Sequence, residues 1–221
     1  MNNRTDILVQ KVRNELKDPG GHRVNPSIIL SELDAIQLEV AQRGLAIKDE
    51  TDLTLEKGTD LYDLGGGNGT IFRLKGFVRP PSWNDPLEIV NDVRKWDELV
   101  SSRNATNHRL TSVGLIPPTS RQCTHAMIWN GRLRLFPAPA KTGDQFRVYF
   151  YRLPSANLEE GRDPEVDRLW DNALLWGALG KMVGDPWASK YEFELERLKQ
   201  QEMNESGRPL TVEHFTDNVG F

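Results

Sequence analysis

The chain has 221 residues, of which 38% are hydrophobic and 27% are charged, and its formal net charge at pH 7 is −4. This length allows one large domain or two small ones, each able to bury a core. The negative balance argues against a protein that holds nucleic acid through its phosphates, because that requires clustered Lys and Arg. No run approaches the roughly 18 apolar residues of a membrane span, so we expect a cytosolic protein without membrane contact.

Four Asx-Pro pairs predict where helices begin, since each places an N-cap side chain before a proline suited to the first helical position. An earlier segment, residues 4–17, has apolar residues at helical spacing. The pairs are Asn25-Pro26, Asp85-Pro86, Asp163-Pro164 and Asp185-Pro186, and the helices expected after them cover residues 26–44, about 86–103, 164–183 and 186–205. In the first of these we expect Gly44 to serve as the C-cap. The last two should fold back as an antiparallel pair.

Between these helices the apolar period changes to two, which predicts strands at residues 53–56, 70–78, 122–129, 132–137 and 145–152. Asn130-Gly131 predicts a type I′ hairpin turn between two of them. Residues 141–144 predict the next turn.

The order of these elements lacks strand–helix alternation, which favours an α+β fold. We expect a helical bundle of about five helices with antiparallel β strands inserted into it. Residues 1–50 and 160–206 would form the bundle, and residues 51–159 the inserted β-rich region, with one helix at about 86–103. Residues 207–221 would form an extended C-terminal arm.

The stretch LYDLGGGNGTIF, residues 61–72, resembles a phosphate-binding loop because four glycines lie within Gly65–Gly69. Such a loop leads into a helix whose N-terminal amides face the anion, whereas residues 70–78 have a strand pattern. We therefore predict a flexible turn between strands, with a nucleotide site as the alternative.

Catalytic and metal-binding motifs are scarce, and the four histidines are scattered along the sequence. The single cysteine excludes an internal disulfide. Cys123 and His125 would face the same way on a strand and could share a metal ion. The alternative is a buried thiol beside an imidazole in solvent. The charged run from Lys190 to Lys199 is interpreted as a solvated helix face without an acid–base role.

The segment WDNALLWGALGKM, residues 170–182, is apolar almost all round, so it must be buried on several faces. Its partners would be the core of its own bundle or a neighbouring copy of the chain. The candidate core or subunit contacts are Trp170, Leu174, Trp176, Gly177 and Gly180.

The final residues, 207–221, cannot continue the last helix because Gly207 and Pro209 interrupt it. The segment is more apolar than a solvated tail needs, so disorder and docking are both open. We expect it to become ordered on a partner, through the apolar residues Leu210, Val212, Phe215, Val219 and Phe221.

In their order and amino-acid sequences, these segments resemble those of the head–tail adaptor, or connector, proteins of tailed phages. The resemblance covers residues 4–205 and rests on four stretches without an invariant chemical motif. The stretches are SIILSELDAIQLEVAQRG, LTLEKGTDLYDLGGGNGTIFRLKGF, GRLRLFPAPAKTGDQFRVYFYRLP and DRLWDNALLWGALGKMVGDPWASKYEFELERLKQ. The sequence departs from the family in the glycine-rich loop, where a proline-containing loop is more usual, so no role is transferred to that loop.

The resemblance implies a structural virion protein of the neck, between head and tail, that is assembled in the host cytoplasm. It would form a ring of twelve copies under the portal protein, extend the DNA channel and provide the attachment site for a tail or nozzle protein. DNA would pass without specific binding, and no catalytic residue, metal or cofactor is implied. The alternatives are a free-standing scaffold or tail protein, and a small cytosolic enzyme or metal-binding protein that uses Cys123 and His125 or the Gly65–Gly69 loop.

Overall fold

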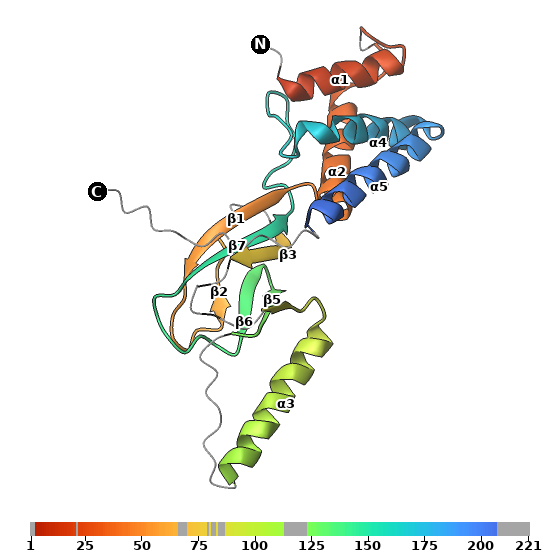
Figure 1. Ribbon diagram of the computed structural model, residues 1–221. Helices are drawn as coiled ribbons and strands as arrows, with labels where there is room; N and C mark the ends of the chain where they lie inside the picture. The colour runs from red at the N-terminus through yellow and green to blue at the C-terminus, as the bar shows by residue number, and fades with distance from the viewer. Residues whose placement is uncertain are drawn as a thin grey trace, which may run out of the picture. The chain divides into compact units, whose positions relative to one another are not determined.

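The protein has a mixed α+β fold, seen in a computed structural model that describes residues 3–20, 22–65, 70–78, 80, 83, 87–112 and 123–206. For residues 105–112 and 205–206 it describes the backbone alone. The described residues contain five α-helices and two sheets (Figure 1). They form two compact units, which we call the helical unit, within residues 1–49 and 151–206, and the strand unit, within residues 50–65 and 71–150.

The helical unit consists of four α-helices and one short 3₁₀ helix. They are α1 (Arg4–Glu15), α2 (Pro26–Gly44), η1 (Arg168–Trp170), α4 (Asp171–Val183) and α5 (Trp187–Ser206). Figure 1 shows α4 and α5 side by side in front of α2, with α1 across one end of α2. One core joins these helices, including Leu8, Val12, Ile29, Leu33, Ile36, Val40, Trp170, Leu174, Leu179, Tyr191, Leu195 and Leu198.

The start of α2 confirms the prediction, because the Asn25 side chain accepts a hydrogen bond of 3.0 Å from the Ser27 amide. The predicted C-cap is wrong. Leu45, with φ of 59°, takes the left-handed position, and Gly44 is the last helical residue. A Cβ at Gly44 would lie 2.6 Å from Cη2 of Trp170, so glycine is needed there for close packing rather than for its backbone freedom.

The helix predicted from Pro164 begins only at Arg168, as the 3₁₀ turn that precedes α4. Residues 163–167 serve α1 instead. The Arg4 amide donates to Oδ1 of Asp163 at 2.7 Å, and the Arg4 guanidinium donates to the carbonyls of Val166 and Asp167 at 2.6 and 2.7 Å. These contacts engage the backbone that a helix from Pro164 would have used, which explains why the Asp163-Pro164 signal does not decide the structure.

The strand unit contains two sheets and one helix. Its elements are β1 (Lys48–Thr54), β2 (Leu61–Tyr62), β3 (Ile71–Val78), β4 (Glu88–Ile89), α3 (Val93–Ser112), β5 (His125–Trp129), β6 (Arg132–Phe136) and β7 (Gln145–Arg152). The strand orders are β1-β7-β3 and β2-β6-β5-β4. Strands β2, β6 and β5 pair antiparallel, whereas the short β4 runs parallel to β5.

The predicted hairpin at Asn130-Gly131 is confirmed, because φ is positive at both residues, 48° and 74°, as a type I′ turn requires. It joins β5 to β6 in a register that sets Trp129 opposite Arg132 and His125 opposite Phe136. Local turn chemistry therefore fixes this part of the sheet.

The helix predicted at about 86–103 is wrong at both ends, since Glu88–Ile89 is a strand and α3 runs from Val93 to Ser112. Amides of Glu88 and Val90 donate to the carbonyls of Thr124 and Ala126, each at 2.8 Å. Pairing with a distant strand thus overrides the local helical spacing. The strand predicted at 53–56 also differs: β1 runs from 48 to 54 and pairs with β7.

The core of the strand unit lies among its strands and includes Leu55, Leu64, Leu74, Trp83, Leu133, Leu135, Phe146, Val148 and Phe150. A smaller cluster holds α3, where Trp96 packs with Val90 and Met127 and its ring meets Phe136 edge-on at 6.0 Å.

Candidate functional site

The predicted aromatic segment lies at the centre of the helical unit. Trp170 is 5% exposed and Leu174 is fully buried. The ring of Trp170 lies directly against Gly44 at the end of α2. The two segments of the helical unit, within residues 1–49 and 151–206, therefore meet here. Trp170 and Leu174 are therefore core residues of the helical unit.

Gly177 and Gly180 are the points of closest approach between helices. A Cβ at Gly177 would lie 2.6 Å from Cγ2 of Ile36 on α2, and one at Gly180 would lie 3.0 Å from Cα of Ala188 on α5. Trp176 is half-buried and packs against the edge of the core. Whether this segment also touches another copy of the chain remains a prediction.

An ion-pair cluster, which the sequence analysis missed, stabilises the end of the unit near β1 and β7. The Arg152 guanidinium donates to Asp49 at 3.0 Å and to Glu165 at 2.7 Å. Burial opposes the Arg152 charge, yet these carboxylates raise its pKa above the usual value. Glu165 also accepts hydrogen bonds from the amide and hydroxyl of Ser155, at 2.8 and 2.6 Å.

A hollow of about 400 Å³ lies beside this cluster. It is lined by Leu45, Ala46, Ile47, Lys48, Arg152, Glu165, Asp167, Leu169, Trp170, Leu198, Gln201 and Glu202. Charged side chains of the lining pair with one another. Lys48 forms an ion pair with Glu202, and Glu202 also accepts a hydrogen bond of 2.8 Å from the Tyr151 hydroxyl. Because these charged side chains pair with one another, we assign the hollow no ligand.

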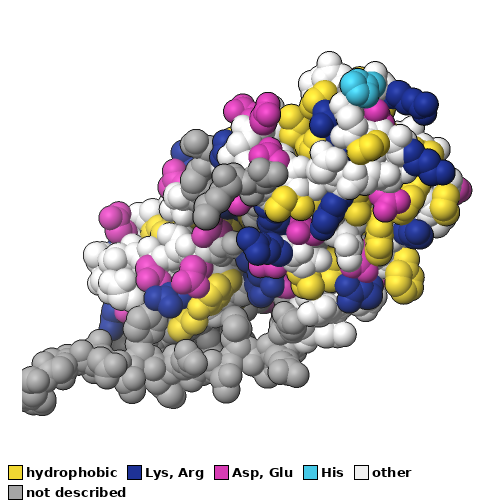
Figure 2. Space-filling model, turned by 90° about the horizontal axis from the view of Figure 1, so that it is seen from above, with side chains coloured by type: hydrophobic (Ala, Val, Ile, Leu, Met, Phe, Trp, Pro, Cys, Tyr) yellow, Lys and Arg dark blue, Asp and Glu magenta, His cyan; other side chains and the backbone are white. Residues whose placement is uncertain are grey.

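The outer faces of the helical unit carry large apolar side chains in solvent. Among the described residues these are Ile7, Ile28, Leu38, Leu169, Val183, Phe193 and Met203. Phe193 on α5 is the extreme case, with 72% of its surface exposed. Figure 2 shows hydrophobic side chains among charged ones of both signs on the surface seen from above. Such residues are available for contact with a protein partner.

The run Lys190–Lys199 is only in part a solvated face. Glu194 is buried and accepts two hydrogen bonds from Arg197, at 2.7 and 2.8 Å, and Glu192 binds Arg43 of α2. The sequence signal for a different role was Phe193, an aromatic residue within a charged run.

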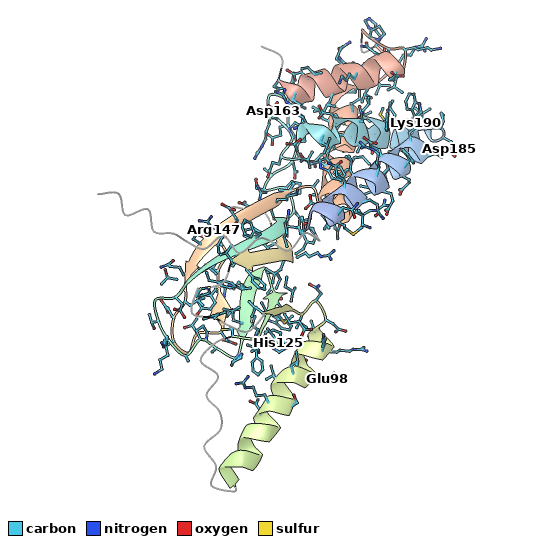
Figure 3. All side chains as sticks on the ribbon, in the orientation of Figure 1. Glu98, His125, Arg147, Asp163, Asp185 and Lys190 are labelled. Carbon is cyan, nitrogen blue, oxygen red and sulfur yellow. The ribbon has the colours of Figure 1, made fainter. Side chains whose placement is uncertain are left out.

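Cys123 and His125 lie in different surroundings. Cys123 is fully buried, and burial together with Asp144 raises the pKa of its thiol to about 12. Burial lowers the pKa of His125, whose Nδ1 lies 2.8 Å from the Thr124 hydroxyl (Figure 3). Within the described part of the chain, no three His, Cys, Asp or Glu side chains come together in a way that could hold a metal ion.

Two predicted segments lie outside the described residues. One is the glycine loop beyond Gly65. Gly65 itself has a φ of 57°, and its amide donates a hydrogen bond of 3.0 Å to the Asp63 carboxylate. The other is the arm, residues 207–221, with Leu210, Val212, Phe215, Val219 and Phe221. In the described helices, no segment combines the length and apolar character that crossing a membrane requires.

The model of the SU10 adaptor protein family matches residues 4–213, which is nearly the whole chain. No curated protein matches the sequence.

Proposed function

Because the chain belongs to the SU10 adaptor protein family, a family of phage head–tail adaptors, we propose that it forms a ring of twelve copies beneath the portal. The family makes it a structural component of a phage particle that interacts with other head or tail proteins. The match over residues 4–213 is the observation that carries the proposal. In the ring, each copy would extend the DNA channel and present an attachment site to a tail or nozzle protein.

The physical character of the chain supports this role. The formal charge of −4 suits a channel through which DNA slides, since clustered cations would hold the phosphates. A ring needs two complementary faces on each copy and no cofactor. We therefore propose that the protein has no enzymatic activity and binds neither metal nor nucleotide in carrying out its function.

We assign the parts of the ring subunit as follows. Residues 1–50 and 160–206 form a helical bundle, residues 51–159 form the inserted β-rich region, and residues 207–221 form a C-terminal arm. The arm reaches the portal through its apolar residues and pairs with an exposed strand edge there. The cost of ordering it falls at assembly, so docking depends on the arm while folding does not.

The experiment that tests the function mixes the purified chain with the portal protein of the same phage. Native mass spectrometry should give a closed ring of twelve copies, alone or only with portal, and electron microscopy should place it under the portal around the channel. A stable small oligomer that ignores the portal would contradict the proposal.

Deleting residues 207–221 tests the arm separately. The truncated chain should be folded by circular dichroism and fail to bind the portal. Unchanged affinity for the portal would show that the arm is not the contact.

A further inference from the structure

One face of α2 is free of charge and open to solvent. Ile28, Ser31, Ala35, Leu38 and Gln42 are all exposed and recur every three or four residues, so they form a single stripe. Ile28 is 52% exposed and Leu38 is 46% exposed. Since Ser31 and Ala35 are small, the stripe has a shallow centre between two larger apolar side chains. We call it the α2 stripe.

A protruding side chain of matching character lies on another face of the same unit. Phe193 of α5 is exposed, with Lys190 one turn before it and Arg197 one turn after it on the same side of the helix. The ammonium of Lys190 lies 4.2 Å from the centre of the Trp187 ring (Figure 3 labels Lys190). Aromatic residues are enriched at protein interfaces and among their hot spots.

The two features point away from each other. The buried side of α2, with Ile29, Leu33 and Ile36, faces the shared core, and the α2 stripe is on its opposite side. Phe193 is likewise opposite the buried Tyr191 and Leu195 of α5. Figure 1 shows α5 and α2 in different layers of the unit. One chain therefore cannot bring Phe193 onto its own stripe, but consecutive copies can.

The charges around the two features are complementary. Glu32, Asp34, Glu39 and Arg43 are the charged residues that flank the α2 stripe. Glu39 pairs with Arg43 and Lys181, and Arg43 also pairs with Glu192, which leaves Glu32 and Asp34 as an excess of negative charge. The Asp34 carboxylate accepts a hydrogen bond of 2.6 Å from the Leu158 amide. Around Phe193, Arg197 is paired with Glu194 and Lys199 with Glu196, which leaves Lys190 as the excess positive charge. Complementary charge at a rim favours one partner and one register.

From these observations we propose that Phe193 of one copy packs into the α2 stripe of the next copy, over Ala35. The contact joins two different faces of identical chains, which is the heterologous pairing that closes rings. The proposal rests on the proposed function, because it names the contact within the ring suggested there.

Cysteine cross-linking tests the contact. In the double variant Ala35→Cys/Phe193→Cys, mild oxidation of the assembled ring should give a ladder of covalent oligomers up to the full ring on a denaturing gel. Each single variant should give no ladder, because only unlike faces meet. Ile7→Cys/Phe193→Cys is the matched control, since Ile7 is an exposed apolar residue on α1. The native Cys123 is buried and can stay in place.

A substitution at the anchor gives an independent measurement. Phe193→Asp should weaken subunit association at least about 30-fold, the loss typical of an interface hot spot, while the thermal unfolding midpoint stays unchanged. Met203→Asp, at another exposed apolar position of α5, should leave the ring intact.

The outcomes separate this contact from the proposed function. If the unmodified chain forms the ring but the double cysteine variant gives no ladder, the contact is wrong and the function stands. Dimers from Phe193→Cys alone would reveal a two-fold contact and overturn the proposal. A ladder from Ala35→Cys/Phe215→Cys in its place would show that the arm of a neighbour occupies the stripe. If no ring forms with the portal, the proposed function fails and this contact fails with it.

Discussion

The helical unit and the strand unit differ in where they leave apolar surface. Of the nine large hydrophobic residues that are exposed among the described residues, seven belong to the helical unit and only Val93 and Trp129 belong to the strand unit. Ion pairs lie on the surface of both units, for example Arg147–Asp52 in the strand unit and Arg43–Glu192 in the helical unit. Among the described residues, the helical unit therefore offers more exposed apolar side chains to a subunit partner than the strand unit does.

The two units also differ in how the chain builds them. The strand unit uses one stretch of chain with a short interruption, whereas the helical unit joins residues 1–49 to residues 151–206. Two contacts join these segments: Trp170 packs against Gly44, and the Arg4 amide donates a hydrogen bond to Asp163. The helical core therefore cannot close until the second segment has been synthesised, because its buried residues come from both segments.

The largest effect is expected at Trp170. Truncation to alanine should cost about 3–5 kcal/mol, because a large buried ring leaves a cavity beside Gly44. Phe193→Ala should change stability by less than about 0.5 kcal/mol, because that ring is exposed. Urea unfolding of both variants measures the difference. Equal losses would remove the distinction between a core aromatic and a contact aromatic in this unit.

A smaller loss is expected at Gly177. Helix propensity alone would make Gly177→Ala stabilising by about 0.8–1.0 kcal/mol. The added Cβ would meet Ile36, a branched side chain with little freedom, so we expect a net loss of about 1–2 kcal/mol. The double variant with Ile36→Ala should lose less than the sum of the single losses. Strict additivity would mean that the two helices have room to separate.

The ion-pair cluster should make stability depend on acid. The Glu165 pKa lies below its usual value of 4.5, because hydrogen bonds from Ser155 and Arg152 outweigh the opposing effect of burial. Its contribution is therefore present above about pH 4.5 and is lost as pH falls below that value.

Glu165→Gln should cost about 1–3 kcal/mol at pH 7, between the values for exposed and buried pairs, and should flatten the decline in acid. Denaturant unfolding between pH 3 and 7 measures this, with the exposed Glu160→Gln as control. The same acid dependence in both variants would place the titration elsewhere.

Much of the local structure could be predicted from the sequence, because its causes are local. The Asn25 cap and the Asn130-Gly131 turn depend on neighbouring residues alone and were predicted correctly. The start of α3 was missed because apolar residues at 89 and 93 fit a helix, while pairing with β5 is decided by residues more than thirty positions away. The separation into two sheets was missed for the same reason.

The candidate contacts show the same limit. Trp170 and Gly177 were recognised as packing residues, but their partners Gly44 and Ile36 lie more than 120 positions away and have no signal in the segment itself. The α2 stripe had a signal that was not used: Ile28 and Leu38 fall off the buried side of their helix. An apolar residue on the wrong face of an amphipathic helix predicts a contact beyond the chain's own core.

The smallest effect is expected at Cys123, where the interior of the strand unit should hold a thiol that takes no part in chemistry. Its pKa of about 12, against a usual value of 9.0, means that the protein binds this proton more tightly when folded. The stability it contributes is complete below pH 9 and is lost only as pH rises toward about 12, so the neutral range should be flat. Because the thiolate is the reactive form, alkylation at pH 8 should be about 1,000-fold slower in the folded chain than in guanidinium. Cys123→Ala is the blank, as the chain has no other cysteine. Rapid labelling of the folded protein would show that the core of the strand unit is accessible to the reagent. It would then favour the alternative of an enzyme or metal site at Cys123 and His125.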